Sequence, residues 1–209
     1  QSVVIALSGT DIDTNTLTYS LGSDATSGSV VIDGTIATYT PTSNFNGDDS
    51  FSFTVSDGEL TDTAEVSLTI EAVNDAPVLA TVSDVSFDED TSGSTSLSGS
   101  DIDGDDLTYS ISGGSDITAT LTGSDVSFSA PANFNGSETF TVSVSDTDLA
   151  DSQSITVTVN AVNDAPVATV GLSGSTNEDQ SVVVNLSGSD IDGDNLTFTL
   201  DTDAANGSV

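Results

Sequence analysis

The sequence lacks lysine, arginine, histidine, cysteine, methionine and tryptophan altogether. Nucleic-acid binding relies on basic side chains that neutralise phosphates, so this class of function is excluded, and so is attraction to an anionic membrane surface. Without histidine or cysteine there is no Ser-His-Asp or Cys-His catalysis, no disulfide and no zinc site of the usual kind. No stretch approaches the roughly 20 apolar residues of a membrane span, so no direct membrane insertion is expected in this part of the chain.

Acidic side chains, in contrast, are abundant: 34 of the 209 residues are Asp or Glu, and the formal charge is −34. Because no side chain can be cationic near neutral pH, no ion pair between side chains can form. Each carboxylate must therefore face water, accept hydrogen bonds from backbone N–H groups, or bind a cation from solution.

The apolar residues, 35% of the chain, alternate with polar ones over short runs. Phe51, Phe53 and Val55 alternate with Ser and Thr, and Phe140–Val144 and Ile155–Val159 show the same pattern. Such period-two alternation is typical of half-buried β-strands, and no segment has a comparable helical period. The sequence therefore predicts a folded, all-β protein.

The chain also repeats itself. Asn74–Val78 recurs 89 residues later as Asn163–Val167, and Asp101–Gly104 recurs at the same interval as Asp190–Gly193. The expected domains are 1–73, a repeat that lacks its first strand; 74–162, a complete repeat; and 163–209, the N-terminal part of a third. A longer natural protein that continues in both directions is expected.

One full repeat reads as seven short strands separated by turn signals, which predicts tandem seven-stranded Greek-key β-sandwiches of the immunoglobulin or cadherin type, arranged end to end. The expected strands lie near residues 79–87, 94–99, 107–112, 116–122, 125–129, 139–145 and 152–159.

The recurring segments AVNDAPV, SGSDIDGDDLTYSI and NFNG carry a family resemblance. They resemble the cadherin-like, VCBS-like tandem repeats of giant bacterial RTX-type surface adhesins. The likeness covers essentially the whole chain, and the Asn-Asp-Ala-Pro linker is similar to the calcium-binding linker of cadherins. The resemblance implies a secreted, calcium-stiffened extender or adhesion module, and it implies no particular ligand.

The Greek-key frame brings acidic loops from different parts of a repeat to its two ends. The first junction is expected to bind calcium through Asp75, Asp101, Asp103 and Asn74, and the next through Glu89, Asp164, Asp190 and Asp192. The full set of expected ligands is Asp11, Asp13, Asp57, Asn74, Asp75, Glu89, Asp90, Asp101, Asp103, Asp105, Asp146, Asn163, Asp164, Glu178, Asp179, Asp190, Asp192 and Asp194.

Calcium takes six to eight oxygen ligands, and Asp-x-Asp on a loop lets two carboxylates turn to one point. A single Asp-x-Asp has a simpler explanation, because Asp and Asn are common turn residues and acidity aids solubility. The recurrence of the linker, loop and corner acids together favours calcium. The first copy of this acidic loop is expected to bind calcium with lower affinity, because Asn15 stands where the second copy has Asp105.

These observations favour a structural role over catalysis. Calcium-stiffened extender repeats of a large extracellular adhesin or surface fibre, which project a binding tip in cell adhesion or biofilm attachment, are the main hypothesis. The expected partners are neighbouring repeats of the same chain. A glycan- or protein-binding module and a subunit of a self-assembling filament of further copies are the alternatives. No enzyme is expected, because a catalytic carboxylate pair repeated every 89 residues is implausible.

Overall fold

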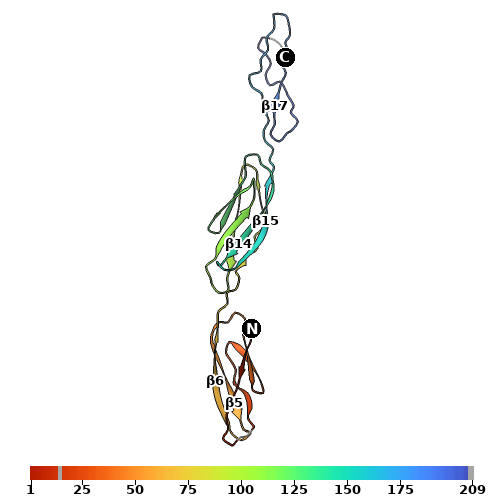
Figure 1. Cartoon of the computed structure of the whole chain (residues 1–209). Helices are drawn as coiled ribbons and strands as arrows, with labels where there is room; N and C mark the ends of the chain where they lie inside the picture. Colours follow the sequence, from red (N-terminus) through yellow and green to blue (C-terminus); the bar gives the residue numbers. More distant parts are fainter. Residues whose placement is uncertain (14–15, 207–209) are drawn as a thin grey trace. The chain divides into compact units, whose positions relative to one another are not determined.

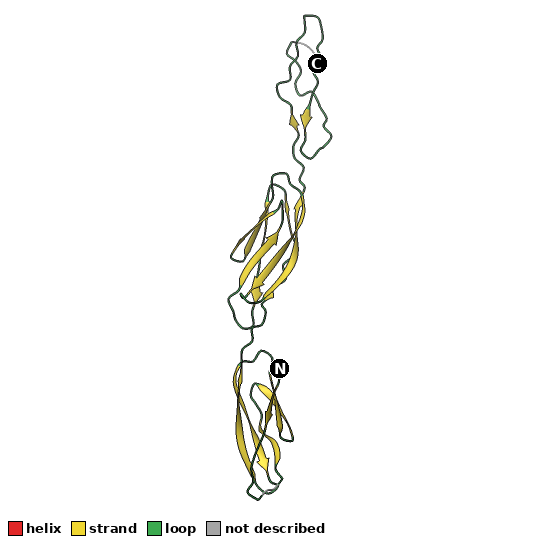
Figure 2. Ribbon diagram, viewed as in Figure 1, coloured by secondary structure: helices red, strands yellow, loops and turns green. Residues whose placement is uncertain are grey.

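The computed structural model describes residues 1–13 and 16–206, which form an all-β structure in two compact units, Gln1–Asp75 and Ala76–Val209 (Figure 1). Strands and loops make up this described part of the chain (Figure 2). The tandem β-sandwich fold predicted from the alternating sequence pattern is therefore confirmed. No helix capable of crossing a membrane occurs among the described residues.

Unit 1 is a sandwich of two three-stranded antiparallel sheets, with the strand orders β1-β4-β3 and β2-β5-β6. The turn between β3 and β4 has Gly34 at a φ of 58°, as the Asp-Gly sequence predicts. Its strands are β1 (Val3–Ala6), β2 (Thr18–Ser23), β3 (Gly28–Asp33), β4 (Ile36–Pro41), β5 (Gly47–Ser56) and β6 (Thr61–Ile70).

The core of unit 1 lies between these sheets. Phe51 and Phe53 of β5 point inward, as their alternation with polar residues predicts, while Leu17 and Tyr19 are only half-buried. The buried apolar residues are Leu7, Val30, Ala37, Tyr39, Phe51 and Phe53.

Unit 2 contains the complete repeat, whose two main sheets have the strand orders β12-β13-β9 and β11-β14-β15-β8. The strands of this repeat are β7 (Val78–Leu79), β8 (Val85–Asp88), β9 (Ser92–Ser96), β10 (Gly99–Ser100), β11 (Thr108–Gly113), β12 (Thr118–Thr122), β13 (Asp125–Ser129), β14 (Gly136–Ser145) and β15 (Ala150–Asn160).

The first expected strand, residues 79–87, is not continuous. It divides into β7, which pairs antiparallel with β10, and β8, which pairs parallel with β15. Side chains of β15 hold the segment in place: the Asp151 carboxylate accepts the Leu79 N–H at 2.9 Å, and the Gln153 amide donates to the Val82 carbonyl at 2.7 Å. The expectation of one strand was wrong because the segment crosses from one pairing partner to another, which an alternation pattern does not reveal.

The core of unit 2 confirms the predicted inward faces of β14 and β15. Phe140, Val142, Val144, Ile155 and Val157 are each at most 1% exposed. The Phe140 ring meets the Phe128 ring edge-on, with 5.3 Å between ring centroids. Phe128 of β13 and Phe140 of β14 belong to different sheets, so their contact holds the two layers of the sandwich together.

The remainder of unit 2 begins a further copy of the repeat. β16 (Val167–Ala168) pairs with β17 (Gly188–Ser189) as β7 pairs with β10, and each partner lies 89 residues after its counterpart. Several large apolar side chains of this part are exposed, among them Val182, Leu186 and Phe198.

A carboxylate near the start of β5 in unit 1 and of β14 in unit 2 closes a loop in each unit. In unit 2, Glu138 accepts hydrogen bonds from the Ser115 hydroxyl and from the backbone N–H groups of Ser115, Asp116 and Ile117. In unit 1 its counterpart Asp49 accepts the N–H groups of Thr26 and Ser27 at 3.0 and 2.9 Å. Burial raises the pKa of Asp49, but these hydrogen bonds outweigh burial and lower it.

The Glu138 clamp should make unit 2 sensitive to acid. Hydrogen bonds from Ser115, Asp116 and Ile117 lower the pKa of Glu138 from 4.5 to about 2. A carboxyl group whose pKa is lower in the folded than in the unfolded protein stabilises the fold at pH values above the unfolded-state pKa. This stabilisation is lost as the pH falls towards the folded-state pKa. Glu138→Gln should therefore destabilise unit 2 at pH 6, and the difference from the unchanged protein should shrink between pH 4.5 and about 2.

Chemical unfolding at a series of pH values in calcium-free buffer measures this difference. Glu65→Gln is the matched control, because Glu65 is exposed on β6 of the other unit. A constant difference between Glu138→Gln and the unchanged protein across the whole pH range would contradict the clamp.

Candidate metal centre

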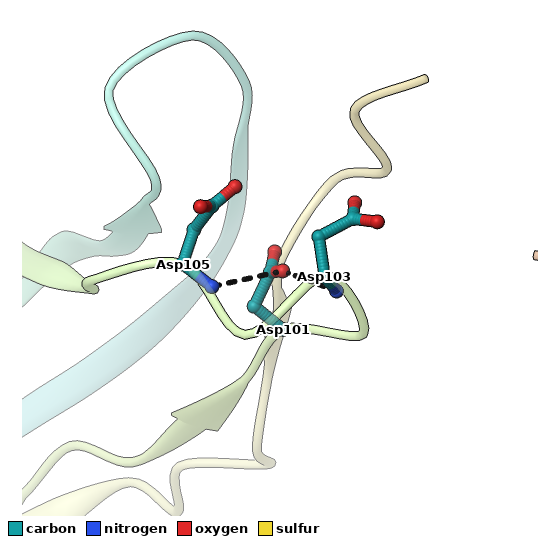
Figure 3. Close-up of side chains that lie close together, drawn as sticks. All are labelled: Asp101, Asp103 and Asp105. Atoms are coloured by element: carbon teal, nitrogen blue, oxygen red, sulfur yellow. Dashed lines mark hydrogen bonds between the residues drawn. The ribbon is translucent and has the colours of Figure 1, made fainter. Parts of the chain in front are cut away.

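The first candidate site is an acidic loop, defined by Asp101, Asp103 and Asp105, that follows β10. One oxygen of Asp101, Oδ1, accepts the N–H groups of Asp103 at 2.8 Å and Gly104 at 3.1 Å, and lies 3.5 Å from the Asp105 N–H. Gly104 has a φ of 81°, which favours glycine. Figure 3 shows the loop wrapped around the Asp101 side chain, so the fold of the loop itself positions all three carboxylates.

These three carboxylates each offer an oxygen within 4.8 Å of the others, the only such group of three or more among the described residues. Desolvation by the surrounding loop raises the pKa of Asp105, and the charges of Asp101, Asp103 and Asp146 raise it further. Asp146 belongs to the loop between β14 and β15, so the structure brings this loop near the acidic loop, as the Greek-key frame predicts.

The second oxygen of Asp101 gives an independent indication of a cation. Asp101 Oδ2 is buried from solvent and has no hydrogen-bond partner among the residues that the structure describes. A buried carboxylate oxygen without a partner is costly, because it has lost water and gained no donor. No basic side chain exists in this chain to compensate it, so a cation from solution is the group that fits.

The second candidate site, the linker cluster, is defined by Glu89, Asp164 and Asp192. Glu89 follows β8 and is only 4% exposed. Its Oε1 accepts the Val162 N–H at 2.5 Å, while Oε2 is buried without a partner in the described part of the chain. One carboxylate thus ties the corner between β8 and β9 to the segment that leaves β15.

Asp164 in this segment contacts the loop after β17. Its N–H donates to Asp192 Oδ2 at 2.6 Å, and its own Oδ2 is buried with no partner among the described residues. Desolvation raises the pKa of Asp164, and so do the nearby charges of Asp192, Asp90 and Glu89. Asp190 is a further charged neighbour. The cluster therefore concentrates negative charge from three separate segments.

Asp90 has a structural task beside the linker cluster. It adopts a φ of 61°, and its Oδ1 accepts the Asn133 N–H at 3.1 Å. Asn133 opens the Asn-Phe-Asn-Gly turn, whose Phe134 is half-buried against the core. One oxygen of Asp90 therefore already accepts a hydrogen bond from this turn, which leaves its other oxygen as the one available to a metal ion.

The remaining residues expected at this end are distributed as follows. The Asp190 Oδ1 accepts the N–H groups of Asp192 and Asp194, so the loop repeats the geometry of Asp101. The Asn163 amide donates to the Asp164 carbonyl. Glu178 and Asp179 are the counterparts of Glu89 and Asp90 in the last copy, and both are exposed. Among the described residues, they belong to no group of three carboxylates with oxygens within 4.8 Å of one another.

In unit 1 the expected ligands are less concentrated. Asp11 Oδ1 accepts the Asp13 N–H at 2.7 Å, as Asp101 does for Asp103. Asn15, which weakens this copy in the sequence, lies outside the described residues. Asn74 and Asp75 end unit 1, and their expected role at the first junction stays a prediction.

Asp57 and Asp146 are counterparts that shape the same turn in the two units. Asp57 Oδ1 accepts the N–H groups of Glu59 and Leu60, which lower the pKa of Asp57. Asp146, 7% exposed, uses its Oδ1 in the same way for Asp148 and Leu149. Both aspartates are therefore turn formers, and a cation would have to share them.

The turn after Asp146 is strained, which gives a prediction. Thr147 has a φ of 95°, a conformation rare for a β-branched residue, where unit 1 has Gly58 at 100°. Thr147→Gly should therefore raise the free energy of unfolding of unit 2 by about 1 kcal/mol, because relief of the strain exceeds the entropic cost of glycine. Denaturant unfolding measures the change, and Gly58→Thr should destabilise unit 1. A less stable Thr147→Gly protein would show that the turn is unstrained.

The donor set fits calcium. All the orphaned atoms are carboxylate oxygens, and the surrounding groups are carboxylates, a side-chain amide and backbone carbonyls, which are the hard ligands that calcium prefers. Asp101, Asp103 and Asp105 would hold one ion in the acidic loop, and Glu89, Asp164 and Asp192 would hold another in the linker cluster.

Comparison with known families identifies the repeat. The family model described as bacterial Ig domain matches residues 1–69, 74–160 and 163–209. The chain belongs to the bacterial Ig domain family. The Ig- and cadherin-like character predicted from the repeated motifs is thereby confirmed, while the wider context of an RTX-type adhesin stays a prediction.

Solved structures that resemble these bacterial Ig repeats come from proteins of different kinds. Human protocadherin-24 EC1-2 matches at 16% identity and a TM-score of 0.48, covering 77% of this chain and 88% of that one. An endo-fucoidan hydrolase of glycoside hydrolase family 107 matches at 22% identity and a TM-score of 0.34, covering 78% and 26%. The surface layer protein SbsC, domains 1-6, matches at 17% identity and a TM-score of 0.35, covering 74% and 21%.

None of these likenesses assigns a ligand or an activity to this chain, which spans about a quarter of the length of the matched hydrolase. A search of curated protein sequences finds no match.

The sequence reasoning missed the carboxylates that serve only the bacterial Ig fold. Glu138 and Asp49 occupy equivalent positions, and Asp151 binds the Leu79 N–H. The signal for the first pair was present, because an acid stands at the same point of both repeats although the residue type changes from Asp to Glu.

Proposed function

We propose that these bacterial Ig repeats are calcium-stiffened extender modules of a large extracellular adhesin or surface fibre, where they project a binding tip for cell adhesion or biofilm attachment. Bacterial Ig domains are usually extracellular or surface-exposed, and repeats of this family are adhesion-type modules. The proposal adds calcium to that general role.

The observation that carries the proposal is the buried Glu89 carboxylate with its unpartnered Oε2. A carboxylate that is 4% exposed in a chain with no basic side chain requires a cation or a proton. Asp164 Oδ2, also buried and unpartnered, lies in the segment whose Val162 N–H binds Glu89. The corner that carries Glu89 and the connecting segment that carries Asp164 therefore each contain a carboxylate oxygen that needs a counter-charge.

Calcium bound here would resist bending of the segment between the complete repeat and the copy that follows. Glu89 belongs to the corner after β8, Asp164 to the connecting segment, and Asp192 to the loop after β17. An ion that ligates all three would fix the segment to both sides. In arrays of repeats each unit contacts only its neighbours, so stiffness depends on such connections.

The function we propose is non-enzymatic. The clustered carboxylates hold backbone N–H groups of their own loops through Asp101, Asp146 and Asp190, and their chemistry suits binding of cations. The neighbouring repeats of the same chain are the partners that this role requires.

Isothermal titration calorimetry with calcium tests the proposal. We expect dissociation constants for calcium of about 0.1–1 mM, which are typical of extracellular modules. Glu89→Gln should reduce the affinity of the linker cluster at least tenfold, and Asp101→Asn should do the same for the acidic loop. Small-angle scattering should show a larger maximum dimension with calcium than with EDTA.

Asp62→Asn is the control. The Asp62 carboxylate accepts only the N–H of its neighbour Thr63 among the hydrogen bonds described for it, and it lies on β6, outside both candidate sites. It should bind calcium as the unchanged protein does. No heat of binding up to millimolar calcium would overturn the proposal and leave the acids as solubilising turn residues.

A further inference from the structure

The outer face of the sheet β1-β4-β3 in unit 1 carries exposed apolar residues at its centre. Val31 of β3 and Val4 of β1 lie directly opposite Thr38 of β4, one on each side of it. These residues alternate along their strands with residues that point into the core, so they share the outer face. Val31 is 66% exposed, Val4 63%, and Ile36, two residues before Thr38, 39%. Val31, Thr38, Val4 and Ile36 together form the valine face.

The complete repeat shows that the fold does not require apolar residues at these positions. There the row Thr120-Ser127-Ser94 has the same register on β12, β13 and β9, and Asp125 stands where unit 1 has Ile36. All four of these residues are exposed, although this repeat includes its first strand. The exposure of this face is therefore a property of the repeat, whereas its apolar chemistry is particular to unit 1.

The distribution of charge favours a second copy of this chain as the partner. With a net charge of −34 and no basic side chain, two copies repel each other wherever their carboxylates meet. Asp33 is the one acidic residue of the described strands β1, β3 and β4. Contact between two valine faces therefore brings few charges together, and it removes exposed apolar side chains from water.

Other outward strand faces of this chain are chemically different. On the long strands β5 and β14, the residues that alternate with the core are serine, threonine and aspartate. These polar faces stay hydrated and offer no apolar surface to the valine face. The valine face itself has apolar residues at the matching spacing, and two copies of it can stack as sheets do inside a sandwich.

We propose that the valine face of unit 1 binds the valine face of a second copy of this chain, so that two copies of unit 1 pair side by side. Four residues cover much less than the roughly 800 Å² per partner of a standard interface, so the pairing is weak, with a dissociation constant of about 0.1–1 mM. Many copies at one surface would reinforce such weak pairs through their high effective concentration.

Sedimentation equilibrium of the chain in calcium buffer, at protein concentrations up to about 1 mM, tests the proposal. Sodium chloride at about 0.3 M screens the repulsion between the acidic copies. We expect the weight-average mass to rise from that of a monomer towards that of a dimer. The methyl resonances of Val4, Val31 and Ile36 should shift with concentration, while those of Val126 in the core of unit 2 should not.

Two reciprocal exchanges between the units locate the contact. Val4→Ser combined with Val31→Thr introduces the residues of the complete repeat without a change of charge, and should weaken association at least tenfold. Ser94→Val combined with Thr120→Val gives the complete repeat an apolar row of its own, and should raise the mass beyond that of a dimer. Circular dichroism confirms that both proteins keep their β-structure.

A charge at the centre of the valine face gives an independent test. Thr38→Asp should abolish association, because the two new carboxylates would face each other in the contact. Thr141→Asp adds the same charge at an exposed position of β14 and should associate as the unchanged protein does.

Three results would overturn the proposal. The first is a monomer mass that stays constant up to about 1 mM, which would leave the valine face to a partner of another kind. The second is association that persists in the Val4→Ser, Val31→Thr protein, which would place the contact on another surface. The third is an equal effect of Thr38→Asp and Thr141→Asp, which would reduce the association to a response to net charge.

Discussion

Replacing Phe140 with alanine should lower the free energy of unfolding of unit 2 by about 3–5 kcal/mol, the usual cost of truncating a buried phenylalanine. Phe140 is 1% exposed and packs its ring against Phe128 of the opposite sheet, with 5.3 Å between centroids. The alanine would leave a cavity between the two layers, and the rigid strands β13 and β14 would close it only in part. A loss of this size is a large fraction of the stability of a small domain.

Urea unfolding followed by circular dichroism and tyrosine fluorescence measures the effect. Thr141→Ala is the matched control, because Thr141 is the next residue of β14 and is exposed. It should change the stability by no more than about 0.5 kcal/mol. A loss below about 1 kcal/mol for Phe140→Ala would mean that the inward face of β14 is not the one carrying Phe140.

Removing calcium should lower the melting temperature by about 10 °C or more. A ligand that binds only the folded state stabilises it by about 2.7 kcal/mol at a hundredfold excess over its dissociation constant, and one kcal/mol shifts the melting of a domain of this size by about 4–8 °C. In the proposed calcium-bound state, the buried oxygens of Glu89, Asp101 and Asp164 would lose their counter-charge on removal of the ion. Self-repulsion of a chain with a net charge of −34 adds to the loss.

Differential scanning calorimetry in calcium, in magnesium and in EDTA measures this effect. Magnesium should stabilise less than calcium, because it demands a tighter octahedral geometry and gives up its water reluctantly. Sodium chloride at matched ionic strength controls for general screening of the charge. The calcium model fails if the three melting curves coincide, or if screening alone reproduces the effect of calcium.

The alternating strands were predictable because successive side chains of β14 and β15 point in turn to the core and to solvent, and the sequence alternates apolar and polar residues in the same way. Phe140 and Val157 therefore lie where the pattern puts them. The division of the first strand was not predictable, since it depends on Asp151 and Gln153, whose partners at Leu79 and Val82 are about 70 residues away. Long-range hydrogen bonds of this kind leave no period in a sequence.

The candidate ligands divide in the same way. Asp101, Asp103 and Asp105 were predictable as a group because their spacing on one loop brings them together locally. The burial of Glu89 depends on the Val162 N–H, 73 residues away, and only the structure reveals it. Asp90 and Asp146 carry the same residue type as the ligands, but their hydrogen bonds to Asn133 and Leu149 assign them first to turns.

The first strand of the complete repeat carries Phe87, which faces Gly93, whereas in the following copy Gly174 of the equivalent segment faces Val182. This exchange of residue sizes has a consequence for folding on the ribosome. Neighbouring repeats emerge in succession and share nearly the same strands, so an early repeat risks recruiting a strand from the next and becoming trapped in a mispaired state. Val85 and Phe87 would collide with a repeat that has valine at the position of Gly93. Gly174 and Thr176 in place of Val85 and Phe87 would bury less apolar surface in the complete repeat, where Phe87 is 7% exposed. In these two copies, the matched sizes favour pairing of each first strand with its own repeat, and therefore correct sorting of similar segments within one long polypeptide.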